Sequence, residues 1–211
     1  MSTNVTSPRL YYVHDPMCSW CWGFRPVWMR LRESLAETVR IESVLGGLAP
    51  DTEEPMPQRM RTDLQKTWEK VRQSIPGTVF NFDFWTLNTP RRSTWLACRA
   101  VLCAGFQNTQ AGDDMVFAIQ KAYYTQARNP SDAEVLEDLA AALGLDRKRF
   151  AKDLLSEEAE QALRAQFMLR DRLDARSFPS LVLEFDGRYR HIEINYTDEA
   201  PMLGRVHSLM S

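Results

Sequence analysis

Two cysteines separated by two residues, Cys18 and Cys21, lie between a β-forming run and a helical run. The run Arg9–His14 is short and rich in β-forming residues, and Asp15-Pro16 ends it because a residue before proline avoids regular structure. An amphipathic helical pattern follows, and a second β-forming run, Val39–Leu45, ends at a pair of glycines. This β-α-β order places the cysteine pair at the carboxyl edge of a sheet, where ligands and chemistry usually collect.

A long helical block follows this opening, and a β-β-α segment closes the chain. Helical periodicity predominates over residues 57–174. The β-forming runs Leu181–Phe185 and Tyr189–Ile194 then flank Asp186-Gly187, a strong hairpin signal, and a last helix is expected from about Asp198 to Met210. The predicted fold class is α/β, with a core formed by residues 1–52 and 175–211 and an all-helical insertion over residues 53–174.

Local signals predict where two of the inserted helices begin. Thr89 followed by Pro90 is typical of an N-cap with proline at the first helical position. Ser131 and Glu134 have the spacing of a capping box, and Gly144 is expected to stop the helix that they start.

The position of the cysteine pair at a helix N-terminus predicts different roles for the two thiols. Unsatisfied backbone N–H groups and the positive end of the helix dipole favour the thiolate of Cys18, which is expected to attack from an exposed loop. Cys21 lies one turn further on, close enough to resolve a mixed disulfide at Cys18, and its interior position is expected to keep it protonated until then. The neighbouring Met17 and Trp20 are expected to line the pair with apolar surface that suits unfolded polypeptide.

Four further side chains are expected in the core. Cys98 and Cys103 lie five residues apart in a helical segment, so they point to different helix faces. Their apolar neighbours indicate small buried hydrophobic residues rather than a second redox pair. Trp22 and Phe24 follow Cys21 in the first helix and are likewise assigned to the core.

The Cys-Ser-Trp-Cys motif and the order of elements resemble the DsbA-like branch of the thioredoxin superfamily over nearly the whole chain. Members of that branch are disulfide oxidoreductases and isomerases in which a helical domain interrupts a thioredoxin-like core. The resemblance implies a redox-active Cys18–Cys21 disulfide that acts on protein or peptide disulfides. It also implies a cis-proline loop facing the pair, which Pro179 matches directly before a predicted strand, and a proline five residues after the second cysteine, which Pro26 matches.

The implied cis-proline loop assigns substrate binding to Phe178 and Pro179. A cis Phe178–Pro179 bond within contact distance of Cys18 would direct the Phe178 backbone outward, where its polar groups can pair with an extended substrate in strand fashion. The missing N–H of Pro179 would remove a donor that competes for the thiolate.

The group that moves protons for the resolving thiol is the least determined part of the predicted site. Many thioredoxin-like enzymes have a buried carboxylate six residues before the first cysteine, where this chain has Tyr12. His14 and Asp15 lie nearer the pair and are the candidates for proton transfer. A lone histidine at a strand end is nevertheless more often a hydrogen-bonded structural residue.

Composition gives no support for nucleic acid or membranes as partners. The formal net charge is -2, from 26 Lys and Arg against 28 Asp and Glu, which offers no electrostatic reason to expect nucleic acid or an anionic membrane. No apolar stretch has membrane-span length and the first residues are polar, so a cytoplasmic protein without a signal peptide is expected. No metal or bound cofactor is expected, and the electron donor is left open, with glutathione and thioredoxin as the candidate thiols. These patterns do not determine the oligomeric state.

Three alternatives to a protein disulfide oxidoreductase stay open. Glutathione-dependent isomerases and transferases of the kappa and hydroxychromene-carboxylate isomerase type look like the same inserted fold, but they do not need Cys21. A structural zinc module would use both cysteine pairs, although the pair within the helix would converge poorly on a metal. A non-catalytic binding module would use the same apolar surface and would survive the loss of both thiols.

Overall fold

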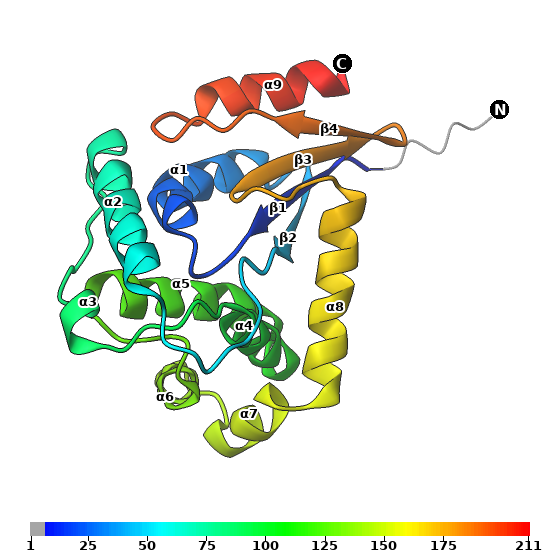
Figure 1. Cartoon of the computed structure of the whole chain (residues 1–211). Coiled ribbons are helices and arrows are strands. Elements are labelled where there is room, and N and C mark those ends of the chain that lie inside the picture. The colour runs from blue at the N-terminus through cyan, green and yellow to red at the C-terminus, as the bar shows by residue number, and fades with distance from the viewer. Residues whose placement is uncertain (1–6) are drawn as a thin grey trace.

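A computed structural model describes residues 7–211 as a four-stranded sheet with helices on both faces (Figure 1). Residues 1–6, part of the polar start for which no signal peptide is expected, lie outside the described residues. The strand order is β2-β1-β3-β4, with β1 parallel to β2 and antiparallel to β3, and with β3 antiparallel to β4. The elements are, in chain order, β1 (Arg9–His14), α1 (Ser19–Leu35), β2 (Arg40–Leu45), α2 (Gln58–Ser74), α3 (Phe84–Leu87), α4 (Trp95–Gln107), α5 (Thr109–Thr125), α6 (Ala133–Ala142), α7 (Arg147–Leu154), α8 (Glu157–Arg172), β3 (Ser180–Phe185), β4 (Arg188–Ile192) and α9 (Ala200–Met210).

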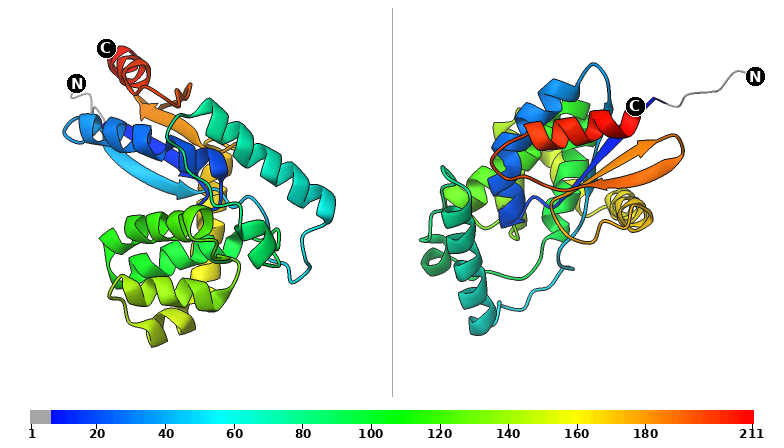
Figure 2. Two further views of the ribbon diagram at one scale, coloured as in Figure 1. Left: turned by 90° about the vertical axis from the view of Figure 1, so that its left-hand side faces the viewer. Right: turned by 90° about the horizontal axis from the view of Figure 1, so that it is seen from above.

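This order confirms the predicted α/β fold. The chain opens as β-α-β and closes as β-β-α, and helices α2 to α8 lie between β2 and β3 in the sequence. Figure 2 shows most of these helices gathered on one side of the sheet, away from α9. The limits of the insertion, at residues 53 and 174, stay a prediction. Within residues 7–211, no helix combines the length and the apolar character that crossing a bilayer requires.

Successive side chains of β1 point to opposite faces of the sheet, and each face has its own core. Leu10 and Tyr12 pack with α1 and α9 on one face, whereas Tyr11 and Val13 pack toward the end of α8 on the other. A third and larger core fills the helical block around Trp68. The ring centroid of this tryptophan lies 4.8–5.8 Å from those of six other aromatic rings.

The predicted start of α4 is wrong, because a distant segment binds the residues involved. The helix begins at Trp95, five residues after Pro90. The Pro90 carbonyl instead accepts the backbone N–H of Met56 at 2.8 Å, and an isolated β-bridge joins Pro55 to Arg91 next to it. This pairing keeps the backbone around Thr89 and Pro90 extended.

The predicted capping box of α6 is also wrong. Asp132 is the N-cap residue, and the hydroxyl of Ser131 donates to the carbonyl oxygen of Ser93 at 2.9 Å. The Ser131 side chain therefore joins two segments of the helical block instead of starting a helix. The predicted stop is confirmed, because Gly144 has a φ of 77° two residues after the end of α6.

The predicted β3–β4 hairpin is confirmed. Asp186 and Gly187 have φ values of 52° and 67°, the left-handed pair that a two-residue hairpin turn requires. The second strand ends at Ile192 rather than at Ile194.

Candidate active site

Cys18 lies between the end of β1 and the first residue of α1. Its backbone N–H donates to the Asp15 carbonyl oxygen at 3.0 Å, which closes a tight turn. The side chain is the N-cap of α1, and the backbone N–H of Cys21 donates to the Cys18 Sγ at 3.4 Å. The Cys18 sulfur therefore lies at the N-terminal end of α1, where a backbone N–H points at it.

The sequence predicts that Cys18 lies in an exposed loop, but the residue is only 6% exposed. The loop that precedes β3 lies against it, and the thiol donates to the carbonyl oxygen of Phe178 at 3.4 Å. The Phe178–Pro179 bond is cis, as the resemblance implies. The fold thus brings the first cysteine and the predicted substrate loop together across 160 residues of sequence.

Gly46 allows this close approach. A Cβ atom at position 46 would lie 2.2 Å from Cζ of the Phe178 ring, well inside van der Waals contact. The Gly46 N–H also donates to the carbonyl oxygen of His14 at 2.7 Å, which extends the pairing of β1 and β2 by one residue. Because Gly46 has no side chain, the Phe178 ring fits against the backbone at the end of the sheet.

Cys21 is fully buried on α1. Burial raises the pKa of its thiol well above the ordinary value, and the hydrogen bond and charge of Cys18 raise it further. Such a thiol keeps its proton until another group removes it, which is the behaviour expected of a resolving cysteine. No disulfide joins Cys18 and Cys21 in this structure.

Three tyrosines surround the cysteine pair. Tyr12 comes from β1, Tyr124 from α5 and Tyr196 from the segment before α9. Burial raises the pKa of each hydroxyl and charge on Cys18 and Cys21 adds to the rise, which takes the pKa of Tyr196 to about 12. The thiols therefore have neutral aromatic hydroxyls as neighbours. Only Tyr12, which replaces the usual carboxylate, had a signal in the sequence.

Asp15 is a fully buried carboxylate whose oxygen atoms are both hydrogen-bonded. Oδ1 accepts the backbone N–H of Met17 at 2.8 Å, and Oδ2 accepts the Leu48 N–H and the Thr94 hydroxyl, each at 2.7 Å. Burial raises the pKa of Asp15, and these hydrogen bonds oppose the rise. The carboxylate joins the end of β1 to the segment after β2 and to the start of α4. Its role in proton transfer stays a prediction.

His14 is buried at the end of β1, and its ring is stacked on that of Tyr12 with centroids 4.6 Å apart. Its Nδ1 has no hydrogen-bond partner among residues 7–211. Burial lowers the pKa of His14 to about 4; the charge of Asp113 raises it slightly, and the charge of Arg25 lowers it further. The imidazole is therefore neutral at neutral pH, and proton transfer by His14 also stays a prediction.

The buried imidazole predicts that acid destabilises the protein. The unfolded chain binds a proton at His14 with a pKa of about 6.5, whereas the folded chain does so only at about 4. The contribution of His14 is therefore fully present above pH 6.5 and is lost as the pH falls toward 4, by up to about 3 kcal/mol in the free energy of unfolding. Urea unfolding across this pH window measures the loss.

His14→Gln should remove this part of the pH dependence. His191→Gln is the matched control, because His191 is exposed and this substitution should leave the dependence unchanged. Equal slopes for the unsubstituted protein and His14→Gln would contradict the prediction.

Met17 and Trp20 flank Cys18 but have different surroundings. Met17 is buried in the core of the helical block, which corrects the expectation that it presents apolar surface beside the thiols. Trp20 is half-buried, its ring lies 5.1 Å from that of Tyr196, and the Lys70 ammonium lies 6.0 Å from its centroid. Of the two, Trp20 has the accessible surface that substrate contact requires.

Cys98 and Cys103 are both buried on α4, as expected. The Cys98 Sγ lies 3.7 Å from Oδ2 of Asp15, so this thiol packs behind the active-site turn. Burial raises the pKa of Cys103 to about 12. In the described part of the chain, no three His, Cys, Asp or Glu side chains are grouped in a way that would hold a metal ion.

Comparisons with known proteins agree with this architecture. A family model described as thioredoxin matches residues 11–202. A solved structure from Nitrosomonas europaea, named "putative protein disulfide isomerase", is 27% identical with a TM-score of 0.83, and the match covers 97% of this chain and 98% of that one. The cytosolic disulfide reductase DsbM from Pseudomonas aeruginosa is 25% identical with a TM-score of 0.76, covering 96% and 98% of the two chains.

The curated relatives are named as adapter proteins and not as disulfide isomerases or reductases. The ClpXP adapter protein SpxH of Halalkalibacterium halodurans is 27% identical over 178 residues, which cover 82% of this chain. The same alignment covers 58% of the relative. The chain thus spans little more than half the length of the curated relatives that it matches.

Proposed function

Because the chain belongs to the thioredoxin family, in its DsbA-like form, we propose that it is a thiol–disulfide oxidoreductase acting on protein or peptide disulfides. The observation that carries the proposal is the asymmetry of the two thiols. Cys18 caps α1 and receives the Cys21 N–H, whereas the Cys21 thiol is fully buried with a raised pKa. Similarity to a cytosolic disulfide reductase supports the same reaction class and a cytoplasmic location.

The proposed reaction has two exchange steps. The Cys18 thiolate attacks one sulfur of a substrate disulfide, which forms a mixed disulfide and releases the other substrate sulfur as a thiolate. Cys21 then loses its proton and attacks the Cys18 Sγ, which closes the Cys18–Cys21 disulfide and releases the second substrate thiolate. Two electrons pass from the cysteine pair to the substrate. A thiol donor such as glutathione or a thioredoxin restores the reduced pair.

The Phe178–Pro179 loop is the proposed substrate contact. The Phe178 carbonyl oxygen faces the Cys18 Sγ, and Phe178 itself is half-buried. An extended peptide bound to this backbone would bring its disulfide to Cys18. Trp20, which is half-buried, adds apolar surface on the helix side of the thiol.

The reduction potential of the cysteine pair tests the proposed reductive direction. The protein is equilibrated in glutathione buffers of graded composition, and the fraction of oxidised pair is counted after acid quenching. A potential near that of thioredoxin, about -270 mV, supports net reduction, and each 30 mV corresponds to about 1.4 kcal/mol. A potential near the DsbA value of about -120 mV would contradict it and indicate an oxidant. Stable binding of glutathione without oxidation of the pair would favour a glutathione-dependent isomerase or transferase.

An adapter role is the second candidate, because curated relatives matched over most of this chain are named as adapters. An adapter binds a partner protein without needing thiol chemistry. Replacing both Cys18 and Cys21 with serine separates the two functions. Partner capture that persists in this double variant, with no disulfide turnover in the unsubstituted protein, would favour the adapter.

A further inference from the structure

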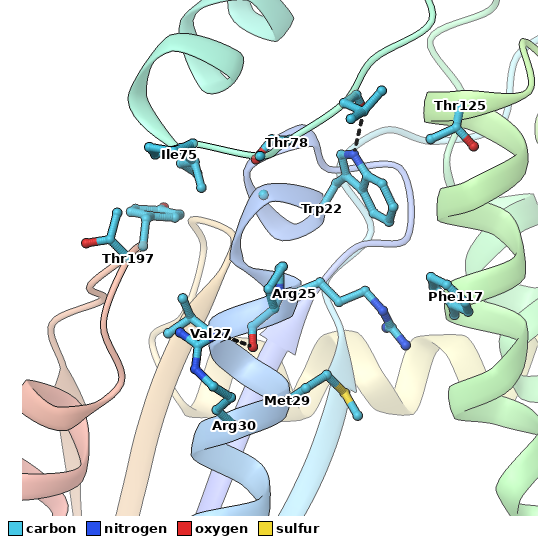
Figure 3. Close-up of a pocket in the computed structure, with 16 residues that line it drawn as sticks. Trp22, Arg25, Val27, Met29, Arg30, Ile75, Thr78, Phe117, Thr125 and Thr197 are labelled. Carbon is cyan, nitrogen blue, oxygen red and sulfur yellow. Dashed lines mark hydrogen bonds between the residues drawn. The ribbon is translucent and has the colours of Figure 1, made fainter.

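A cavity of about 660 Å³ opens across the first turns of α1 (Figure 3). Its walls come from α1, the loop after α2, α5 and the segment before α9. Neither Cys18 nor Cys21 is among the lining residues. The volume falls within the range of about 300–1,000 Å³ that is typical of small-molecule sites.

Aromatic and aliphatic side chains form most of the lining. The sequence predicts a core position for Trp22, but the residue is half-buried in the wall of this cavity. Its indole N–H donates to the Val79 carbonyl oxygen at 3.0 Å, and its ring is stacked on that of Tyr124. These contacts hold the indole in place before any ligand arrives. Phe117, on α5, is 41% exposed and lines the same cavity, as does Met29 at 43%. A rigid ring and an exposed ring are suited to an apolar ligand.

Arg25 is the unusual residue of this cavity. Its side chain extends from α1 toward Phe117, and the guanidinium carbon lies 4.3 Å from the centroid of that ring (Figure 3). Burial lowers the pKa of Arg25, so the guanidinium has lost part of its hydration. Yet no hydrogen bond or ion pair joins it to another of the residues described here. A partly desolvated guanidinium offers strong, charge-assisted hydrogen bonds to an anion.

We propose that this cavity binds a small apolar molecule that carries one anionic group, such as a carboxylate or a sulfonate. Arg25 would pair with the anion, and Trp22 and Phe117 would contact the apolar body. The other cation of the lining is already engaged, because Arg30 pairs with Glu199 at 2.8 Å and donates to the Pro26 carbonyl.

Two carboxylates lie near Arg25, those of Asp113 and Asp114, but neither serves as its anionic partner in the cavity. Asp113 is paired with Arg32 at 2.5 Å, which offsets its charge. Asp114 is exposed on α5, where water screens it. Both line a smaller cleft of about 80 Å³, which Arg25 also lines, and not the larger cavity.

Two fluorescent probes with the same aromatic framework test the charge requirement. Anilinonaphthalene sulfonate carries one negative charge, and phenylnaphthylamine carries none. The unsubstituted protein should bind the sulfonate about tenfold more tightly, and Arg25→Gln should remove this preference by weakening the sulfonate alone. Arg25→Lys keeps the charge and should retain a preference, which shows that loss in Arg25→Gln is not a loss of folding. Phe117→Ala should weaken both probes.

Arg30→Gln is the matched control, because this arginine lines the same cavity but is already paired with Glu199. It should leave the affinity for both probes unchanged. The proposal is overturned if the two probes bind the unsubstituted protein equally, or if Arg25→Gln and Arg30→Gln weaken the sulfonate to the same extent. It is also overturned if Phe117→Ala changes neither affinity.

Discussion

Replacing Cys18 with serine is expected to abolish disulfide turnover, whereas replacing Cys21 with serine is expected to trap a mixed disulfide on Cys18. Cys18 is the helix-capping thiol that can act as nucleophile, and a hydroxyl in its place cannot exchange with a disulfide. Turnover should fall by roughly a thousandfold or more in Cys18→Ser. Without Cys21 the first step still proceeds but nothing resolves its product. Non-reducing mass spectrometry of each variant after incubation with a disulfide peptide measures the adduct.

Cys103→Ala is the matched control for these variants. Cys103 is also a buried free thiol, but it lies in the middle of α4 and its pKa is raised to about 12 by burial. Its removal should lower stability and leave turnover largely intact. Equal adduct yields from Cys18→Ser and Cys21→Ser would show that the assigned roles are wrong.

Replacing Asp15 with alanine is expected to lower the free energy of unfolding by at least about 3 kcal/mol. The substitution removes the acceptor of the buried Met17 N–H, the part-buried Leu48 N–H and the buried Thr94 hydroxyl. Because these donors come from three segments, the active-site turn should loosen from the helical block. Asp15→Asn keeps the shape but turns one acceptor into a donor, so its loss should be smaller. Denaturant unfolding at neutral pH measures both.

Asp113→Asn is the control for Asp15→Ala, because it also removes a carboxylate, but one that is partly exposed. Asp113 forms a single ion pair with Arg32 at 2.5 Å, and both side chains are more than a third exposed. Such pairs contribute about 0–1 kcal/mol, so the variant should be nearly as stable as the unsubstituted protein. If Asp15→Ala cost no more than Asp113→Asn, the anchoring role of Asp15 would be refuted.

The sequence by itself determined those features that depend on neighbouring residues. The spacing of Cys18 and Cys21 predicted that Cys18 lies at the start of the first helix and Cys21 one turn further inside, because a single turn of helix sets their relation. Asp186-Gly187 predicted the hairpin, because a two-residue turn needs residues that accept positive φ. The β-forming residues of Arg9–His14 likewise predicted a strand, and the structure begins and ends it at the same residues.

Only the tertiary structure decided the features that depend on contacts between distant segments. Thr94 reaches Asp15 across 79 residues, and no local pattern announces this contact. The contact of Phe178 with Cys18 spans 160 residues, and only the family resemblance led us to expect it. Ser131 looked like a helix cap, but its hydroxyl binds the backbone at Ser93 instead. The local sequence shows which hydrogen bonds a side chain is able to donate or accept. Which partner it meets is settled when the packed cores bring the segments together, because a buried polar group must bind whatever lies within reach.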